Sequence, residues 1–208
     1  MNTALSPRKS PRQSRSTVTV AAILDATAHI LVERGYAATS TNAVAERAGV
    51  SVGSLYQYFP NKDALIAALH VRHIEQMKAV IERALAKAMD ATLADALSEL
   101  IEGAVEAHRI EAGLHRVLEL QLPGHDVSEL TDSFNEVLEG RLLAVLARHR
   151  AELTVPDLKL ASFVLMHSVH ALIHAAVLQR PKGVSLKLAT REIARMVQAY
   201  LTCPVEPA

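Results

Sequence analysis

The sequence predicts an all-α protein. Apolar residues recur at the three- and four-residue spacing of amphipathic helices along most of the chain, and no segment alternates cleanly as a β-strand does. Half of the 208 residues are hydrophobic but only 3% are aromatic, which suits packing between Ala- and Leu-rich helices better than a β-sandwich. We therefore expect about nine helices, three of them in a small head (residues 18–63) and the others in a larger C-terminal domain (residues 64–208).

The chain is expected to begin with a disordered basic arm. Residues 1–17 contain Ser, Thr, Pro and Arg without periodicity. No apolar run follows these basic residues before Thr17, so we do not expect a signal peptide. The first helix is predicted from Val18 to Arg34, and Gly35 is expected to end it.

A helix–turn–helix pattern follows the first helix. The hydroxyls of residues 39–41 can cap one short helix, and Gly49 can end it in the left-handed conformation. Ser51 can cap a second short helix, in which Leu55 and Phe59 point to the core at i, i+4 spacing. Proteins use this arrangement to place one helix in the major groove of DNA.

The second short helix and its surroundings carry the side chains that could contact DNA. A glutamine amide can pair with N6 and N7 of adenine, and a glycine lets the backbone approach closely. The expected base-facing residues are Val52, Gly53, Ser54 and Gln57. Hydroxyls, and a lysine at a helix N-terminus, suit phosphate. The expected phosphate contacts are Ser40, Thr41, Ser51, Tyr56, Tyr58 and Lys62.

Several of these residues have a structural alternative. Capping alone explains Ser40, Thr41 and Ser51 equally well. Packing against the first helix is the alternative for Tyr56, and an unengaged, solvated amide is the alternative for Gln57.

Residues 18–66 resemble the TetR family of bacterial transcriptional repressors. The resemblance rests on ordered matches at fixed spacing: Gly35-Tyr36, Thr39-Ser40, Val44-Ala45, Ala48-Gly49-Val50-Ser51, Gly53, Leu55-Tyr56-Gln57-Tyr58-Phe59 and Lys62. One departure is Ala43, where the family often has an acidic residue that would complete a capping box with Ser40. The resemblance implies a repressor that binds an inverted-repeat operator as a homodimer and is released by a small molecule. It also implies that the last two long helices pair with their mates in a four-helix dimer interface.

The charge distribution agrees with a DNA-binding head. Residues 1–62 carry seven Lys and Arg against three acidic residues, a net charge of +4, whereas residues 63–208 carry fifteen against nineteen, a net charge of −4. The positive charge thus lies in the part expected to meet phosphate. The arm could reach along the DNA backbone or into a minor groove, or it could be a solubilising tail.

The rest of the chain is expected to be helical. Helices are predicted for residues 62–89 and 92–110, for a short segment around Leu114 to Leu118, for residues 127–153, from Pro156 to Gln179, and after the capping residue Ser185. Pro156 is expected in the first turn of its helix. Loops are expected at Pro123-Gly124 and at residues 181–183.

One segment is apolar enough to raise the question of a membrane. The nineteen residues from Leu160 to Leu178 include no Asp, Glu, Lys or Arg, which nearly suffices to span a bilayer. His167, His170 and His174 within the segment favour instead a buried helix that packs inside its own subunit and against a partner. These histidines share one helix face, so metal binding, hydrogen bonding in a pocket, and packing in the core or the dimer interface are the alternatives.

The resemblance also implies a pocket for a small molecule among the C-terminal helices. Its expected lining residues are Leu100, Leu118, Phe134, Met166 and His170. This mostly aliphatic set favours a largely apolar ligand. The alternative is a DNA-binding regulator or architectural protein without a small-molecule ligand, and direct activation of transcription is open as well.

Other function classes are not supported. The sequence has no nucleophile elbow, phosphate-binding loop, HExxH motif or paired-cysteine site, so we expect no enzyme, no bound metal and no cofactor. Its one cysteine, Cys203, cannot form a disulfide within the chain, which fits a reducing, cytoplasmic compartment.

Overall fold

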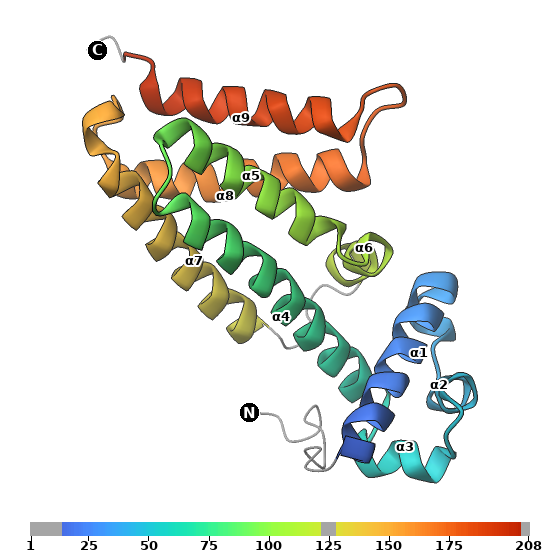
Figure 1. Cartoon of the computed structure of the whole chain (residues 1–208). Coiled ribbons are helices and arrows are strands. Elements are labelled where there is room, and N and C mark those ends of the chain that lie inside the picture. The colour runs from blue at the N-terminus through green and yellow to red at the C-terminus, as the bar shows by residue number, and fades with distance from the viewer. Residues whose placement is uncertain (1–13, 122–127, 205–208) are drawn as a thin grey trace. The chain divides into compact units, whose positions relative to one another are not determined.

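The computed structural model describes residues 14–121 and 128–204, and this part of the chain is helical, as predicted (Figure 1). In chain order its elements are α1 (Ser14–Ala38), α2 (Thr41–Ala48), α3 (Val52–Tyr58), α4 (Lys62–Ala88), α5 (Leu93–Arg109), α6 (Ala112–Gln121), α7 (Ser128–Arg148), the 3₁₀ turn η1 (Arg150–Glu152), α8 (Leu158–Leu178) and α9 (Leu186–Thr202). The predicted all-α class, with about nine helices, is confirmed. The expected loop at Pro123-Gly124 and residues 1–13 of the expected arm lie outside the described residues.

The chain divides into two compact units that do not follow the boundary expected at residue 63. The first unit comprises residues 1–75 and 113–131, and the second comprises residues 76–112 and 132–208. Helix α4 therefore continues from one unit into the other, and α6 belongs to the first unit. The periodicity of the sequence cannot reveal that α6 packs in the first unit, because α6 is separated from the head by more than forty residues of sequence.

Five helices build the core of the first unit. Its buried apolar side chains come from α1 to α4 and from α6: Ile23, Leu24, Ala26, Ala28, Ile30, Leu31, Val44, Ala45, Leu55, Phe59, Ala64, Leu65, Ile66, Leu69, Leu114, Val117 and Leu118. Helix α6 approaches α1 closely at Gly113, where an added Cβ would lie 3.2 Å from Val32 Cγ1. The apolar face of α6 thus completes the core of the predicted DNA-binding head.

Helix α1 is longer than predicted at both ends. It begins at Ser14, so residues 14–17 are helical and do not belong to the arm. Its last turn is interrupted at Gly35, which has φ 73° and ψ 176°. The break at Gly35 was predicted, because a positive φ is easily adopted by glycine alone. The extension to Ser14 was not predicted, because that turn contributes no apolar periodicity.

The helix–turn–helix forms through the predicted local chemistry. Ser40 Oγ accepts a hydrogen bond from the Ala43 amide at 3.2 Å, which caps α2. Gly49 ends α2 in the left-handed conformation with φ 67°. Ser51 Oγ accepts from the Ser54 amide at 3.0 Å and caps α3. These caps satisfy amide groups that have no partner inside the helix, and they confirm both predicted starts and the predicted stop.

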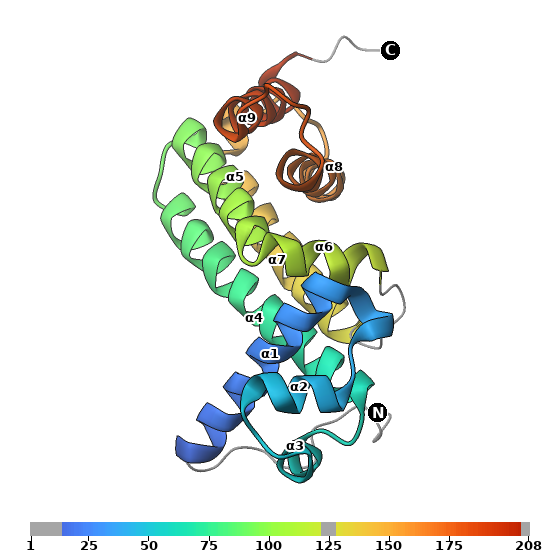
Figure 2. The ribbon, with the colours of Figure 1, turned by 90° about the vertical axis from the view of Figure 1, so that its right-hand side faces the viewer.

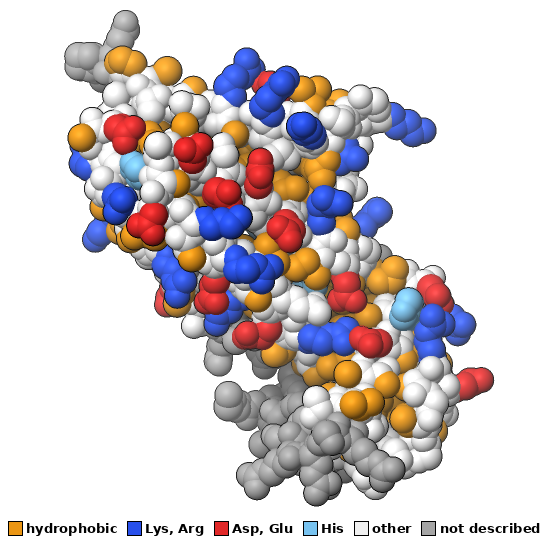
Figure 3. Space-filling model, in the orientation of Figure 1, with side chains coloured by type: hydrophobic (Ala, Val, Ile, Leu, Met, Phe, Trp, Pro, Cys, Tyr) orange, Lys and Arg blue, Asp and Glu red, His pale blue; other side chains and the backbone are white. Residues whose placement is uncertain are grey.

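The second unit is built around α5, α8 and α9, which pack together in Figure 2. Its largest buried apolar cluster consists of Leu93, Leu97, Ile101, Val105, Leu146, Leu153, Val155, Ala161, Leu165, Ile173, Ala176, Ile193, Val197 and Leu201. Helices α5 and α4 approach each other closely at Gly103, where an added Cβ would lie only 2.3 Å from the Ala84 Cβ. On the face shown in Figure 3, Lys and Arg side chains are interspersed with Asp and Glu.

The start of α8 corrects one prediction. Asp157 is its capping residue, and Asp157 Oδ1 accepts hydrogen bonds from the amides of Lys159 and Leu160 at 2.8 and 3.1 Å. Pro156 therefore precedes the cap and does not occupy the first helical turn. The carboxylate satisfies two amides at once, which outweighs the mild preference of proline for the first turn.

Helix α8 is buried on one side only. Among the described residues, α8 and the segment Ser16–Ala38 are long and apolar enough to cross a membrane by length and composition alone. However, α8 places Ala161, Leu165 and Ile173 in the core of the second unit. Leu160 and Phe163 on another side are 58% and 52% exposed. A single chain thus leaves part of the segment Leu160 to Leu178, which has no Asp, Glu, Lys or Arg, uncovered.

Candidate nucleic-acid interface

Helix α3 presents the predicted polar face. Its Leu55 and the following Phe59 are buried in the core of the first unit, which fixes the rotation of the helix. Val52, Gly53 and Gln57 are exposed on the other side. Three of the four residues predicted to face bases are therefore accessible. Gly53 has open space around its Cα, since an added Cβ would meet only Ser51 Oγ at 3.9 Å.

Ser51 and Ser54 are tied to each other. Their hydroxyl oxygens lie 2.8 Å apart, and Ser51 Oγ also accepts from the Ser54 amide. Ser54 is half-buried, so its hydroxyl is less accessible than its neighbours on α3. The capping role of Ser51 is a geometric fact, whereas its contact with phosphate and that of Ser54 with a base stay predictions.

A pair of hydroxyls lies at the start of α2. The Thr41 Oγ1 and Tyr56 Oη atoms are 3.1 Å apart, which ties the exposed ring of Tyr56 to the other helix of the motif. Tyr56 is 42% exposed, so it is not packed into the core. Ser40 caps the same helix end. Backbone amides at the start of a helix and the helix dipole favour an anion. Of the predicted phosphate contacts, the group at the start of α2 therefore has the strongest structural support.

Lys62 is held by contacts that the sequence did not reveal. Its Nζ donates a hydrogen bond to the Tyr36 carbonyl at 3.1 Å and lies 3.8 Å from the centroid of the Tyr36 ring. The Tyr36 hydroxyl in turn donates to the Asp63 carboxylate. This hydrogen bond, together with burial and the Asp63 charge, raises the pKa of Tyr36 above its ordinary value of 10.0.

These contacts join the last turn of α1 to the start of α4. Asn61 caps α4, because its Oδ1 accepts from the Ala64 amide at 2.8 Å. Tyr36, Asn61 and Asp63 are thus positioning residues that the sequence analysis did not select. Tyr36 belongs to the quoted family pattern, but its partners lie 26 and 27 residues away, so no local spacing could identify them. The last predicted phosphate residue, Tyr58, is half-buried against the core.

The residues expected to line a ligand pocket fall in both units. Leu118 is buried in the core of the first unit. Leu100 and Phe134 pack against a smaller cluster of the second unit, around Val80 and Ile81. The remaining two, Met166 and His170, lie on α8. Their common pocket stays a prediction.

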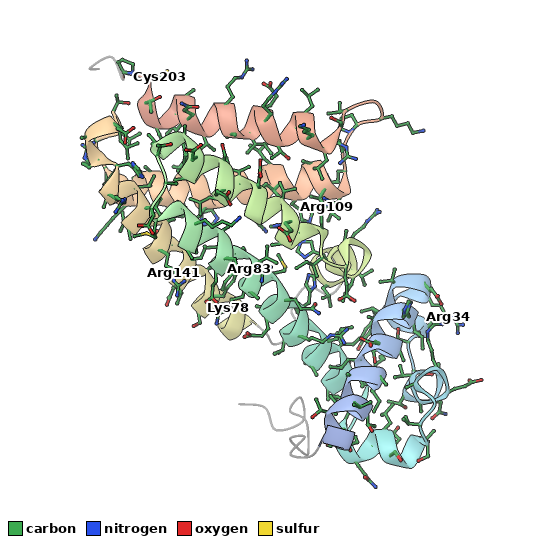
Figure 4. All side chains as sticks on the ribbon, in the orientation of Figure 1. Arg34, Lys78, Arg83, Arg109, Arg141 and Cys203 are labelled. Atoms are coloured by element: carbon green, nitrogen blue, oxygen red, sulfur yellow. The ribbon has the colours of Figure 1, made fainter. Side chains whose placement is uncertain are left out.

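Within residues 14–121 and 128–204, no group of three or more His, Cys, Asp or Glu side chains is arranged to hold a metal ion. Cys203 is exposed at the C-terminal end of α9 (Figure 4) and is the one cysteine of the sequence.

Two family models cover most of the chain. Residues 23–69 match the model described as bacterial regulatory proteins of the tetR family, and residues 92–201 match the tetracyclin repressor-like C-terminal domain. The first match covers the helix–turn–helix described above, and the second covers α5 to α9.

Individual relatives match shorter stretches. The chain is 48% identical over 62 residues to the HTH-type transcriptional repressor KstR of Mycolicibacterium smegmatis, a match that covers 30% of each protein. It is 31% identical over 125 residues to the fatty acid metabolism regulator protein of Bacillus subtilis, which covers 58% of this chain and 60% of that protein. The chain therefore matches less than two thirds of the length of these curated relatives.

Solved structures extend the likeness to the whole fold. The crystal structure of NalD, the secondary repressor of the MexAB-OprM multidrug efflux pump in Pseudomonas aeruginosa, superposes with a TM-score of 0.73 at 19% identity. This superposition covers 92% of this chain and 99% of NalD. At such low identity the likeness concerns the fold alone.

Proposed function

Because the chain belongs to the TetR family, a family of DNA-binding transcription regulators that are not enzymes, we propose that it is a cytoplasmic repressor that binds an inverted-repeat operator and is released by a small, largely apolar molecule. Members of this family bind operator DNA and dimerise. The relative KstR is a repressor by name, and another relative is a regulator of fatty acid metabolism. The first description supports repression, and the second supports an apolar effector.

One observation carries the proposal: α3 buries Leu55 and leaves a compact polar face exposed. A helix of seven residues can offer only a few side chains to a groove. Gln57 is the one with two hydrogen-bonding groups that match an adenine edge. In this proposal Val52 contacts a thymine methyl group, and Gly53 allows close approach of the backbone.

The phosphate contacts flank this face. We assign them to Thr41 at the start of α2, to the hydroxyl of Tyr56 on α3, which lies beside Thr41, and to Lys62 at the start of α4. The Tyr36 carbonyl holds the Lys62 ammonium in place, so Lys62 pays little ordering entropy when it meets a phosphate. Two-fold symmetry of a dimer then places two α3 helices in successive major grooves.

A second copy of the chain is the expected partner of the uncovered side of α8 and α9. The exposed large apolar residues there are Leu160, Phe163, Leu172, Leu188, Met196 and Tyr200. Their burial against the same residues of a partner would form an isologous interface. Phe163→Asp should give monomers in sedimentation without loss of helix content, because the side chain is exposed in one chain. Val137→Asp, at an exposed residue of α7, is the matched control and should stay dimeric.

Footprinting of the full chain on the DNA upstream of its own gene tests the DNA-binding part. Gln57→Ala should relax preference at one base pair in each half-site, at a cost of about 1–3 kcal/mol. Lys62→Ala should weaken binding to all sequences alike and reduce the salt slope by about one unit. Lys182→Ala, an exposed lysine in the loop between α8 and α9, should change neither quantity. Wild-type behaviour of both head variants would refute the assignment.

Release by an effector is tested separately. A gel-shift assay of the protein–operator complex with a panel of apolar and amphipathic metabolites should identify at least one that dissociates the complex. If no compound does so while the operator complex forms normally, a regulator without a small-molecule ligand is the better description.

A further inference from the structure

Two neighbouring helices of the second unit carry opposite charges. Helix α5 has four acidic residues against one arginine, a net charge of −3, and α9 has three basic residues against one glutamate, a net charge of +2. The two helices pack against each other. In Figure 3 acidic side chains gather over α5 and basic side chains over α9. The mixed charges of this face are therefore sorted by helix.

Two residues of each helix match in spacing. Glu102 and Glu106 on α5 are four residues apart, and so are Lys187 and Arg191 on α9. Residues four apart lie on the same side of a helix, with their Cβ atoms about 5–6 Å apart. All four side chains are exposed. These four residues, which we call the α5–α9 face, thus present an acidic pair beside a basic pair of the same length.

The charges of the α5–α9 face are not used by the ion pairs of their own helices. In the part of the chain that the structure describes, the ion pairs of α5 and α9 are Glu99 with Lys87 and Glu192 with Arg195. Both of these pairs involve residues outside the α5–α9 face. Its four charged groups are therefore available to another molecule.

The α5–α9 face is separate from the apolar side of α9 that is expected to pair with a second copy. At 3.6 residues per turn, Met196 is turned about 140° from Arg191 around the helix, and Tyr200 about 180°. Met196 and Tyr200 belong to the exposed apolar set of α8 and α9. A dimer formed through that set uses a different side of α9.

We propose that the α5–α9 face binds the same face of a second copy of the chain. If one molecule is turned over about a two-fold axis that lies between α5 and α9, each acidic pair meets the basic pair of the other molecule. The contact is then isologous, because the same residues serve on both sides. An orientation that places α5 opposite α5 brings like charges together, so the charges also select one orientation of the two molecules.

Such a contact is weak and sensitive to salt. Exposed ion pairs contribute little individually, and the Debye length at 0.1 M salt is only about 10 Å. The contact therefore needs a high local concentration, which two molecules on neighbouring operator sites provide. In this respect the inference rests on the proposed function, since it makes binding to adjacent operators cooperative.

Sedimentation velocity measures the contact in full-length Phe163→Asp, in which the expected α8–α9 interface is blocked and each molecule carries the α5–α9 face once. We expect monomers at about 0.5 M salt and dimers at about 0.02 M salt, because the Debye length rises from about 4 Å to about 20 Å. The unmodified protein should likewise assemble beyond its dimer only at the lower salt, and it serves if Phe163→Asp fails to fold. Assembly that persists at the higher salt, or that is absent at the lower, would overturn the proposal.

Charge reversal tests the pairing in the same background. Glu102→Lys with Glu106→Lys, and separately Lys187→Glu with Arg191→Glu, should each weaken the assembly at the lower salt at least tenfold. An equal mixture of the two variants should restore it, because each acidic pair again meets a basic pair. A mixture that fails to assemble would contradict the assignment.

A second mixture controls for attraction between molecules of opposite net charge. In it, Arg148→Glu with Lys159→Glu replaces the variant of α9. Both residues are exposed, at the end of α7 and in the first turn of α8, and the net charge of this control is the same. This mixture should stay unassembled, because the basic pair of α9 then faces the reversed residues of α5. Restoration as strong as in the reciprocal mixture would refute a specific contact.

Footprinting on DNA with one or two operator sites separates this inference from the proposed function. The charge-reversal variants should lose cooperativity between two sites and keep their affinity for a single site. Normal binding to single sites without salt-dependent assembly refutes the α5–α9 contact alone. Salt-dependent assembly without any operator binding refutes the proposed function and leaves the contact established.

Discussion

The buried hydrogen bond between His73 and His115 links α4 to α6 inside the first unit. The His73 Nε2 and His115 Nδ1 atoms are 3.0 Å apart, and the two residues are only 1% and 2% exposed. One ring must donate an N–H while the other accepts it. Because α6 comes from a distant part of the chain, this bond is a direct polar link between α6 and the helix that leaves the head.

The structure predicts how substitutions at this pair combine. Removing one imidazole deprives a buried nitrogen of its partner, so His73→Leu or His115→Leu should each cost about 1–3 kcal/mol of stability. In the double variant neither polar atom remains, and the cost should fall below the sum of the two by about 0.5–3 kcal/mol. His73→Gln and His115→Asn place amides near the positions of Nε2 and Nδ1, so the variant with both should retain most of the stability.

Urea unfolding followed by circular dichroism measures these free energies. Protomer concentration must be held constant, because dimerisation contributes to apparent stability. The m-value should stay unchanged, which shows that the same surface is exposed on unfolding. Strict additivity of the two leucine substitutions, within about 0.5 kcal/mol, would show that the two rings are not coupled and would refute the reasoning.

Three further substitutions test other parts of the structure. Gly103→Ala should destabilise the second unit by about 1–3 kcal/mol in urea unfolding, because its Cβ would lie 2.3 Å from that of Ala84, although alanine is the better helix former. Asp157→Ala should cost about 1 kcal/mol and expose the first amides of α8 to faster hydrogen exchange. Tyr36→Phe should cost about 1 kcal/mol by removing the hydrogen bond to Asp63. Since that bond raises the pKa of Tyr36 above 10.0, its contribution is fully present below pH 10 and is lost as the pH rises through the higher folded value, a loss that Tyr36→Phe should not show.

Local chemistry made the helix–turn–helix predictable from sequence. Ser40, Gly49 and Ser51 act within three or four residues of themselves, so their capping roles follow from residue type and spacing. The exposed side of α3 followed equally from the spacing of Leu55 and Phe59. The predicted DNA contacts on that face are untested, and the structure adds that Lys62 and Tyr56 are already held by protein partners.

Contacts between distant segments were not predictable. Nothing in the periodicity of α6 indicates that Leu114 and Leu118 belong to the core of the head, because an apolar helix face does not specify what covers it. The meeting of His108 with His170 is hidden for the same reason, since the two lie 62 residues apart on separate helices. The sequence analysis missed the early start of α1 and the capping role of Asp157, because polar residues, which do not contribute to the apolar periodicity, set both of these helix starts.

The assignment of α6 to the first unit has a practical consequence for protein engineering. A fragment that stops anywhere before Gly113 would lack Leu114, Val117 and Leu118, and it would leave the aliphatic surface they cover open to water and to aggregation. A chimera that joins this DNA-binding head to the sensor domain of another protein must therefore include both residues 1–75 and residues 113–131, or supply a substitute for α6.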